Sequence, residues 1–117
     1  MGTNSVLDRL AGQLEHYMDL LSTRQKLVAS NIANADTPGY HTQDIDFQKE
    51  FESALAGQAP ATTEPEGLAV KPDGNNVNLD REARLLSENA LRFSIASNFA
   101  RSQLSSVKTA IQEGKSA

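Results

Sequence analysis

The residues of this chain that could do chemistry are few and widely spaced. Its two histidines, His16 and His41, lie far apart in the sequence, and the chain contains no cysteine. Histidine metal sites need further ligands at short, regular spacings, as in the HExxH pattern, and neither histidine has them. We place His16 on the solvent side of a helix. No metal site and no cofactor is expected.

Two carboxylates, Asp44 and Asp46, alternate along a segment of extended character. Paired carboxylates can act as general acid and base, but no nucleophile with a base and no phosphate-binding loop accompanies them. We interpret the pair as a solvated acidic strand. Its other face, Ile45 and Phe47, is expected to anchor the strand to a helix or to a neighbouring molecule. The sequence thus predicts a protein with no catalytic residue, not an enzyme.

Composition limits both the core and the class of partner. The chain has 117 residues, of which 38% are hydrophobic and 5% aromatic, with no tryptophan. These values fit at most one domain with a thin core. The net charge is -4, and the helical ends show no basic stripe, so nucleic-acid binding is not expected. No apolar run approaches the ~18 residues of a membrane span, and no cleavable signal pattern stands out.

A long amphipathic helix is expected from about Ser5 to Asn34, with Asn4 or Ser5 as its N-cap. Apolar residues recur along it in alternating steps of four and three, interrupted only by Gln25. This 3.5-residue period, kept for about four heptads, is typical of a coiled-coil seam. The apolar seam residues are Leu7, Ala11, Leu14, Met18, Leu21, Val28, Ile32 and Ala35.

A second helix of similar length is expected from about Asp80, as N-cap, to Gly114, as C-cap. Two seams of equal length imply that the helices pack on each other, and the interval between them can return the chain. The predicted fold is mainly all-α: an elongated, antiparallel, coiled-coil-like hairpin. The second seam consists of Leu79, Ala83, Leu86, Ala90, Phe93, Ser97, Ala100, Leu104, Val107 and Ile111.

The middle of the chain is expected to be irregular and partly extended. We predict an extended piece over residues 42–46, a short helix over 47–55, a flexible linker over 57–65 and a weak hairpin pairing 68–70 with 76–79. The single domain therefore divides into an N-terminal axial helix (1–36), a middle segment (37–79) and a C-terminal axial helix (80–117).

Both helices also carry apolar residues outside their seams. On the second helix one such set lies roughly 160–240° from the seam, and on the first another lies about 100° or more from it. An isolated hairpin would leave these side chains exposed, and contiguous exposed apolar patches usually mark interaction sites. The candidate intersubunit residues are Leu20, Leu27, Leu91, Ile95 and Phe99.

The first helix ends in a stop-and-turn segment over residues 30–40. The short amides of two asparagines in it can cap free carbonyls or enter the left-handed region. Pro38 prevents the helix from continuing, and Pro38-Gly39 suits the two central positions of a type II turn. The tyrosine at the end is expected to pin the departing chain. The characteristic residues are Ser30, Asn31, Ile32, Asn34, Thr37, Pro38, Gly39 and Tyr40.

This segment resembles the signature of the bacterial flagellar axial proteins, the rod and hook family, in which the first helix ends in Ser-Asn-(Asn)-Ile-Ala-Asn followed by Thr-Pro-Gly-Tyr. A single Asn separates Ser30 from Ile32, and residues 44–47 read Asp-Ile-Asp-Phe. Both features are most similar to a proximal rod protein of the family, and a sister rod protein is the nearest alternative. Residues 75–82 and 88–93 also resemble the family, whereas residues 57–74 carry no distinctive motif.

The resemblance implies a structural subunit of the flagellar basal-body rod that polymerises through its terminal helices for motility. It implies as partners further copies of the chain, other rod and basal-body proteins and the flagellar type III export apparatus. The implied place is the periplasmic rod, reached without a cleavable signal peptide, with no small-molecule ligand. The alternative from another class is a soluble coiled-coil adaptor or chaperone that binds one client helix at fixed stoichiometry.

Overall fold

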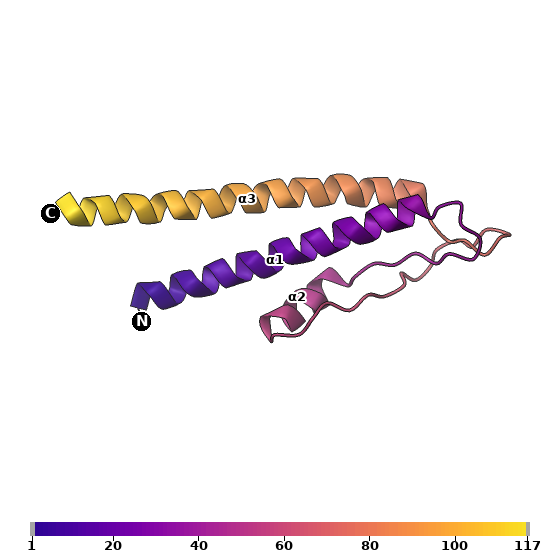
Figure 1. The fold of residues 1–117 in the computed structure, drawn as a ribbon, viewed down its shortest axis with the longest axis horizontal. Coiled ribbons are helices and arrows are strands. Elements are labelled where there is room, and N and C mark those ends of the chain that lie inside the picture. Colours follow the sequence, from indigo (N-terminus) through magenta and orange to yellow (C-terminus); the bar gives the residue numbers. More distant parts are fainter. Residues whose placement is uncertain (1, 117) are drawn as a thin grey trace.

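Two long helices, α1 (Gly2–Ala33) and α3 (Leu79–Ser116), run side by side in opposite directions, and a short helix, α2 (Phe47–Leu55), packs on α1 (Figure 1). The computed structural model describes the backbone of residues 2–116 and the side chains of residues 6–115. The molecule measures 72 × 26 × 18 Å with a radius of gyration of 19.1 Å, whereas a compact chain of this length has a radius of about 13 Å. The predicted elongated all-α hairpin is confirmed.

The helix ends differ from the predicted ones by a few residues. The backbone is helical from Gly2, ahead of the predicted caps Asn4 and Ser5, whose side chains lie outside the described residues. α3 is capped by Asn78, whose Oδ1 accepts a hydrogen bond from the Arg81 backbone N–H at 3.0 Å. Asp80, the predicted cap, is already helical, and so is Gly114, the predicted C-cap.

The short helix α2 occupies the predicted residues. The Asp46 side chain caps it by accepting a hydrogen bond from the backbone N–H of Lys49 at 3.3 Å. Two of its rings meet Tyr17 of α1 edge to face: Phe47 at 5.2 Å and Phe51 at 6.1 Å between ring centroids. Edge-to-face pairs of this kind add to the energy of area burial. This aromatic cluster holds α2 against α1.

The middle segment pairs differently from the predicted hairpin. A turn does form at the predicted place, with the Gly74 N–H donating to the Lys71 carbonyl at 2.9 Å. The residues after it pair with the chain that leaves α1, because the Asn76 N–H donates to the Tyr40 carbonyl at 3.2 Å. The predicted flexible linker is also tied down, since Thr63 exchanges two backbone hydrogen bonds with Asp44 in an isolated bridge.

The core contains one residue that the sequence placed on the surface. Leu20 was expected to contact neighbouring subunits, but it is only 1% exposed. It lies one helical turn from Tyr17, on the side of α1 that α2 covers, so the chain buries it internally. Leu27, one heptad on, is half-buried. The buried apolar residues are Leu20, Leu21, Val28, Ala35, Ile45, Ala54, Val77, Leu85 and Ala96.

The predicted seam agrees with the burial on α1 far better than on α3. On α1, Leu21 and Val28 are buried and Ile32 is exposed; Leu7, Leu14 and Met18 are half-buried. On α3 the prediction is wrong: the buried stripe runs through Glu82, Leu85, Asn89 and Ala96, roughly 60° round the helix from the predicted one. Val107 is half-buried, and the other predicted large seam residues are exposed, namely Leu79, Leu86, Phe93, Leu104 and Ile111.

A polar contact accounts for this rotation of α3. Asn89 Nδ2 donates to the backbone carbonyl of Leu21 at 2.8 Å and to Gln25 Oε1 at 3.2 Å. A buried amide without such partners would be destabilising. The face of α3 that meets α1 is therefore the one on which Glu82 and the amide nitrogen of Asn89 find partners, and the more apolar face is turned aside.

Replacing Leu21 with alanine tests the position of the core. We expect Leu21→Ala to lower the free energy of unfolding by about 2–5 kcal/mol, because a fully buried side chain leaves a cavity. The matched variant Leu91→Ala, at a position 62% exposed, should change it by no more than about 0.5 kcal/mol. Urea unfolding of dilute protein, followed by far-UV circular dichroism, measures both. Equal losses would contradict the described packing.

Candidate functional site

The stop-and-turn segment that follows α1 forms the predicted type II turn. The Tyr40 N–H donates to the Thr37 carbonyl at 3.2 Å, and Gly39, in the third position, has φ +75°. Asn34 caps the helix, donating from Nδ2 to the Ser30 carbonyl at 2.9 Å. No non-glycine residue with described geometry has a positive φ. The alternative of a left-handed asparagine is therefore wrong, and the capping alternative holds for Asn34.

Asn31 does not stop the helix; it joins three segments. Its side chain is buried, with Nδ2 donating to the Gln43 carbonyl at 2.8 Å and to Glu82 Oε1 of α3. Its Oδ1 accepts from the Tyr40 hydroxyl at 2.9 Å and from the Gln43 N–H at 3.1 Å. Ser30 Oγ lies 3.3 Å from the same hydroxyl. Tyr40 thus pins the departing chain, as predicted, and does so through Asn31.

Asp44 is the centre of a buried ion cluster. Arg24 of α1 grips it with two parallel hydrogen bonds of 3.0 Å, from Nε to Oδ1 and from Nη2 to Oδ2. Arg81 of α3 also donates to Oδ2, and its Nη1 donates to Glu82 at 2.8 Å. Asp44 is only 4% exposed, so the interpretation of a solvated acidic strand is wrong for it. We call Arg24, Asn31, Asp44, Arg81 and Glu82 the polar cluster.

The electrostatic balance keeps Asp44 ionised. Burial raises the pKa of its carboxyl group, but hydrogen bonds from Arg24, from the Ile45 backbone N–H and from Arg81, together with the charge of Arg24, outweigh burial. The pKa of Asp44 therefore lies below its ordinary value of 3.8. A carboxylate held by two guanidinium groups is a poor proton donor or acceptor near neutral pH. Its chemistry is that of a structural anion.

Two further asparagines, Asn75 and Asn76, fasten the loop end of the molecule. Asn75 Nδ2 donates to the carbonyls of Asn34 and Thr37, each at 2.8 Å, and so gives a hydrogen bond to two backbone carbonyls just after α1. Asn76 Oδ1 accepts from the Thr42 N–H at 2.6 Å. Both asparagines are buried. We did not single them out as site residues, and their only signal was their place in the run that resembles the family.

Beyond these links, α3 displays two apolar stripes on its surface. The first stripe is the mispredicted seam, Leu86, Phe93, Leu104 and Ile111; the second is Leu91, Ile95 and Phe99. They lie on opposite flanks of the face that meets α1, and with that face they span an arc of roughly 220°. Leu91 and Ile95 are 62% and 59% exposed.

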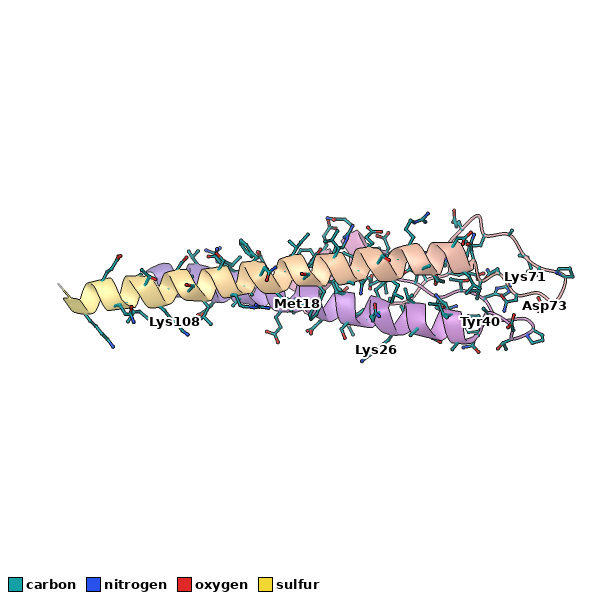
Figure 2. All side chains as sticks on the ribbon, turned by 90° about the horizontal axis from the view of Figure 1, so that it is seen from above. Met18, Lys26, Tyr40, Lys71, Asp73 and Lys108 are labelled. Atoms are coloured by element: carbon teal, nitrogen blue, oxygen red, sulfur yellow. The ribbon has the colours of Figure 1, made fainter. Side chains whose placement is uncertain are left out.

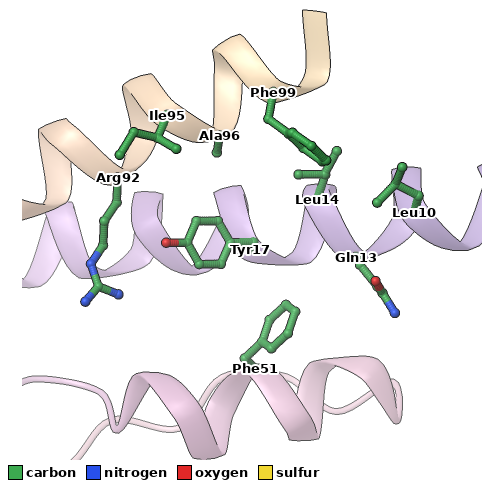
Figure 3. Close-up of a pocket in the computed structure, with 9 residues that line it drawn as sticks. All are labelled: Leu10, Gln13, Leu14, Tyr17, Phe51, Arg92, Ile95, Ala96 and Phe99. Carbon is green, nitrogen blue, oxygen red and sulfur yellow. The ribbon is translucent and has the colours of Figure 1, made fainter. Parts of the chain in front are cut away.

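Grooves follow the line where α1 and α3 meet, on both of its flanks. The α2-side groove, of about 350 Å³, lies between the second stripe, α1 and Phe51 of α2 (Figure 3). The open-side groove, of about 390 Å³, lies on the other flank. Its lining residues are Leu10, Ala11, Leu14, Glu15, Met18, Asp19, Ala100 and Gln103.

The described part of the chain contains no candidate metal-ligand group and no candidate membrane-spanning helix. No group of three or more potential ligand side chains gathers within it. His16 is half-buried, and His41 Nδ1 lies 2.9 Å from Glu64 Oε1 at the surface. Among these residues no helix combines the length and apolar character needed to cross a bilayer.

Several known proteins that are similar to this chain come from one family. A family model described as flagella basal body rod protein matches residues 18–41, which include Asn31, Asn34 and the type II turn. The flagellar basal body rod protein FlgB of Salmonella typhimurium is 31% identical over 93% of this chain and 99% of its own length. FlgB of Escherichia coli is 29% identical with the same coverage. FlgB of Borrelia hermsii is 30% identical over 82% of this chain and 90% of its own.

Protonation of Asp44 should destabilise the protein in acid. Because the folded pKa is depressed, its contribution is present in full well above the ordinary value of 3.8 and is lost as the pH falls past that value toward the folded pKa. At neutral pH, Asp44→Asn should lower the free energy of unfolding by about 3 kcal/mol, since it leaves two half-buried guanidinium groups, each on a side chain 16% exposed, without their shared anion. Urea unfolding of wild type and variant between pH 7 and pH 2 measures both effects.

The control is Asp46→Asn, at the exposed cap of α2, where asparagine caps as well as aspartate. Its unfolding free energy should follow that of the wild type at every pH. The gap between wild type and Asp44→Asn should narrow in acid. A constant gap down to pH 2 would contradict the assigned ionisation of Asp44.

Proposed function

This chain belongs to the family of flagellar basal-body rod proteins FlgB, and on that premise we propose that it polymerises through its two terminal helices. As a member of the family it is a structural component of the basal-body rod. The observation that carries the proposal is the pair of apolar stripes on α3, which its own chain leaves exposed.

The apolar surface of α3 exceeds what one partner helix can cover. A helix apolar over most of its circumference is normally buried on all sides. In the described part of the chain, α3 packs along one face on α1 and otherwise touches α2 through Arg92, whose guanidinium lies 5.7 Å from the centroid of the Phe47 ring. Asn89 Oδ1, beside the first stripe, is a buried acceptor with no hydrogen bond within the described part of the chain. Neighbouring subunits packed on both flanks would cover these groups.

The polar cluster makes the helices a unit that can bear load. It joins residues 24, 31, 44, 81 and 82, so α1, the middle segment and α3 are fastened at one end. We infer that residues 1–36, 37–79 and 80–117 act as one domain. Contacts on two flanks would resist both sliding and rotation of subunits, as a shaft that transmits torque requires.

We extend the proposal to the partners of this chain by the example of the family. Its partners are other copies of the chain, other rod and basal-body proteins, and the flagellar export apparatus that would deliver it without a cleavable signal peptide. The relatives are named as rod proteins, so we assign this chain a structural role and no catalysis.

An adaptor or chaperone for a single client helix is the second candidate. The α2-side groove, open between α1 and α3 (Figure 3), favours it, because one amphipathic helix would fit there. Such a helix would cover the second stripe and leave the first exposed. An adaptor forms a complex of fixed stoichiometry, whereas a rod subunit forms larger species as its concentration rises.

The second stripe gives a direct test of polymerisation. Ile95→Ser with Phe99→Ser should abolish assembly, because both side chains are exposed in the single chain. Helicity of the dilute protein should be nearly unchanged. Sedimentation across concentration measures assembly, and far-UV circular dichroism measures helicity.

The control is Leu85→Ser, on the face of α3 that meets α1. It should reduce helicity before it affects assembly, since it opens the core. A comparable loss of helicity in the Ile95 and Phe99 variant would instead place those residues in the internal core and contradict the proposal.

A further inference from the structure

Among the residues that the structure describes, no helix lies beside the last turns of α3 (Figure 1). α3 runs on past the N-terminal end of α1, so the two termini lie at the same end of the molecule but are staggered (Figure 1). Ala100 and Gln103 still line a groove shared with α1, whereas Leu104 and Ile111 beyond them are exposed. We call residues 104–115 the overhang.

The overhang is a helix with an apolar stripe edged by positive charge. At roughly 100° per residue, Leu104, Val107 and Ile111 fall within about 60° of one another. Lys108 and Lys115, one heptad apart, fall next to this stripe. Glu113, the one acid among residues 104–115, falls about 150° from the stripe centre.

The open-side groove has the complementary pattern. Its floor is apolar and its α1 rim carries Glu15 and Asp19. Asp8 precedes Glu15 by one heptad and so lies on the same face of α1. The salt bridges of the described residues include none of these three acids and neither overhang lysine.

We propose that the overhang of one copy lies in the open-side groove of the next copy, with Lys108 opposite Glu15 and Lys115 opposite Asp8. The inference rests on the proposed polymerisation, and it specifies how the overhang of one copy aligns with α1 of the next. In this register the overhang runs antiparallel to the α1 that it contacts. The heptad spacing of ~10.5 Å is the same for the lysines and the acids. Lys108 and Met18, a groove residue, lie on the same flank of the helix pair (Figure 2).

This contact is heterologous, because it joins two different surfaces of the same chain. Each copy that offers its overhang to one neighbour keeps its own groove free for another. Heterologous contacts give a ring when the rotation closes and an open helical polymer when it does not. The chain thus carries, in one groove and one helix end, the means for an unlimited assembly.

Charge reversal tests the register in the full-length protein. The variant Lys108→Glu with Lys115→Glu should weaken self-association at low salt by at least about tenfold, and so should Asp8→Lys with Glu15→Lys, because opposed charges become like charges. A mixture of the two variants should regain association, since the reversed overhang then meets the reversed groove. Sedimentation velocity across concentration measures each case, and the matched control Glu113→Lys should associate like the wild type.

Engineered cysteines locate the contact, and the absence of native cysteine makes the readout clean. Ala11→Cys protein mixed with Ile111→Cys protein should form a disulfide-linked heterodimer under oxidation. Thr109→Cys, roughly 165° round α3 from the stripe, should not cross-link to Ala11→Cys.

The outcomes separate this contact from the proposed function. Wild-type protein that associates but is insensitive to the charge reversals, or fails to form the 11–111 cross-link, would overturn the contact and leave polymerisation standing. Association that stops at a dimer would likewise overturn a head-to-tail contact. Wild-type protein that does not associate at any concentration would contradict polymerisation itself.

Discussion

The buried polar cluster is the interaction on which the rest of the structure depends. Asp44, in the middle segment, receives Arg24 from α1 and Arg81 from α3, while Asn31 of α1 reaches Glu82 of α3. Opposite charges removed from water are stabilising only when their hydrogen bonds are nearly all made. That requirement allows one relative position of the three segments, and in this chain it is met at the end where α1 stops and α3 starts.

From that end the cluster determines which way α3 faces. With Glu82 and Asn89 turned toward α1, Leu85 and Ala96 must face α1 as well, and the stripes that contain Phe93 and Ile95 must face outward. Apolar surface that would suffice for an ordinary core is thereby placed on the exterior. The buried polar contacts thus have two consequences. They hold the three segments together inside the chain, and they leave apolar surface outside that further copies can bury.

Much of the architecture could be predicted from the sequence, because periodicity and turn chemistry are local properties. The two long helices, α2 and the turn at Pro38-Gly39 all follow from residues close together in the chain. Which side of α3 packs on α1 could not be predicted this way. The sequence pattern shows where apolar residues recur, but it does not show that Asn89 will find a backbone carbonyl on α1. The prediction that Leu20 contacts neighbouring subunits was wrong for a related reason. α2 covers this side chain, and that tertiary contact cannot be read from the local sequence.

The polar residues were the hardest to interpret. In the sequence Asp44 is one of several acids, and the alternation with Asp46 indicated a solvated strand. Its burial depends on arginines far away along the chain, at positions 24 and 81. Asn31 was a plausible helix stop by type and position, yet its four hydrogen bonds all reach other segments. Long-range partners of this kind are visible only when the chain is folded.

The most direct test of this account is amide hydrogen exchange, compared between dilute and concentrated protein. It measures whether the polar cluster forms in the monomer before copies of the chain associate. Amides around Asn31, Asp44 and Glu82 should be protected already in the dilute monomer, and those of residues 104–115 should gain protection only as larger species form. Equal protection of residues 104–115 at both concentrations, or an unprotected cluster in the monomer, would contradict this order.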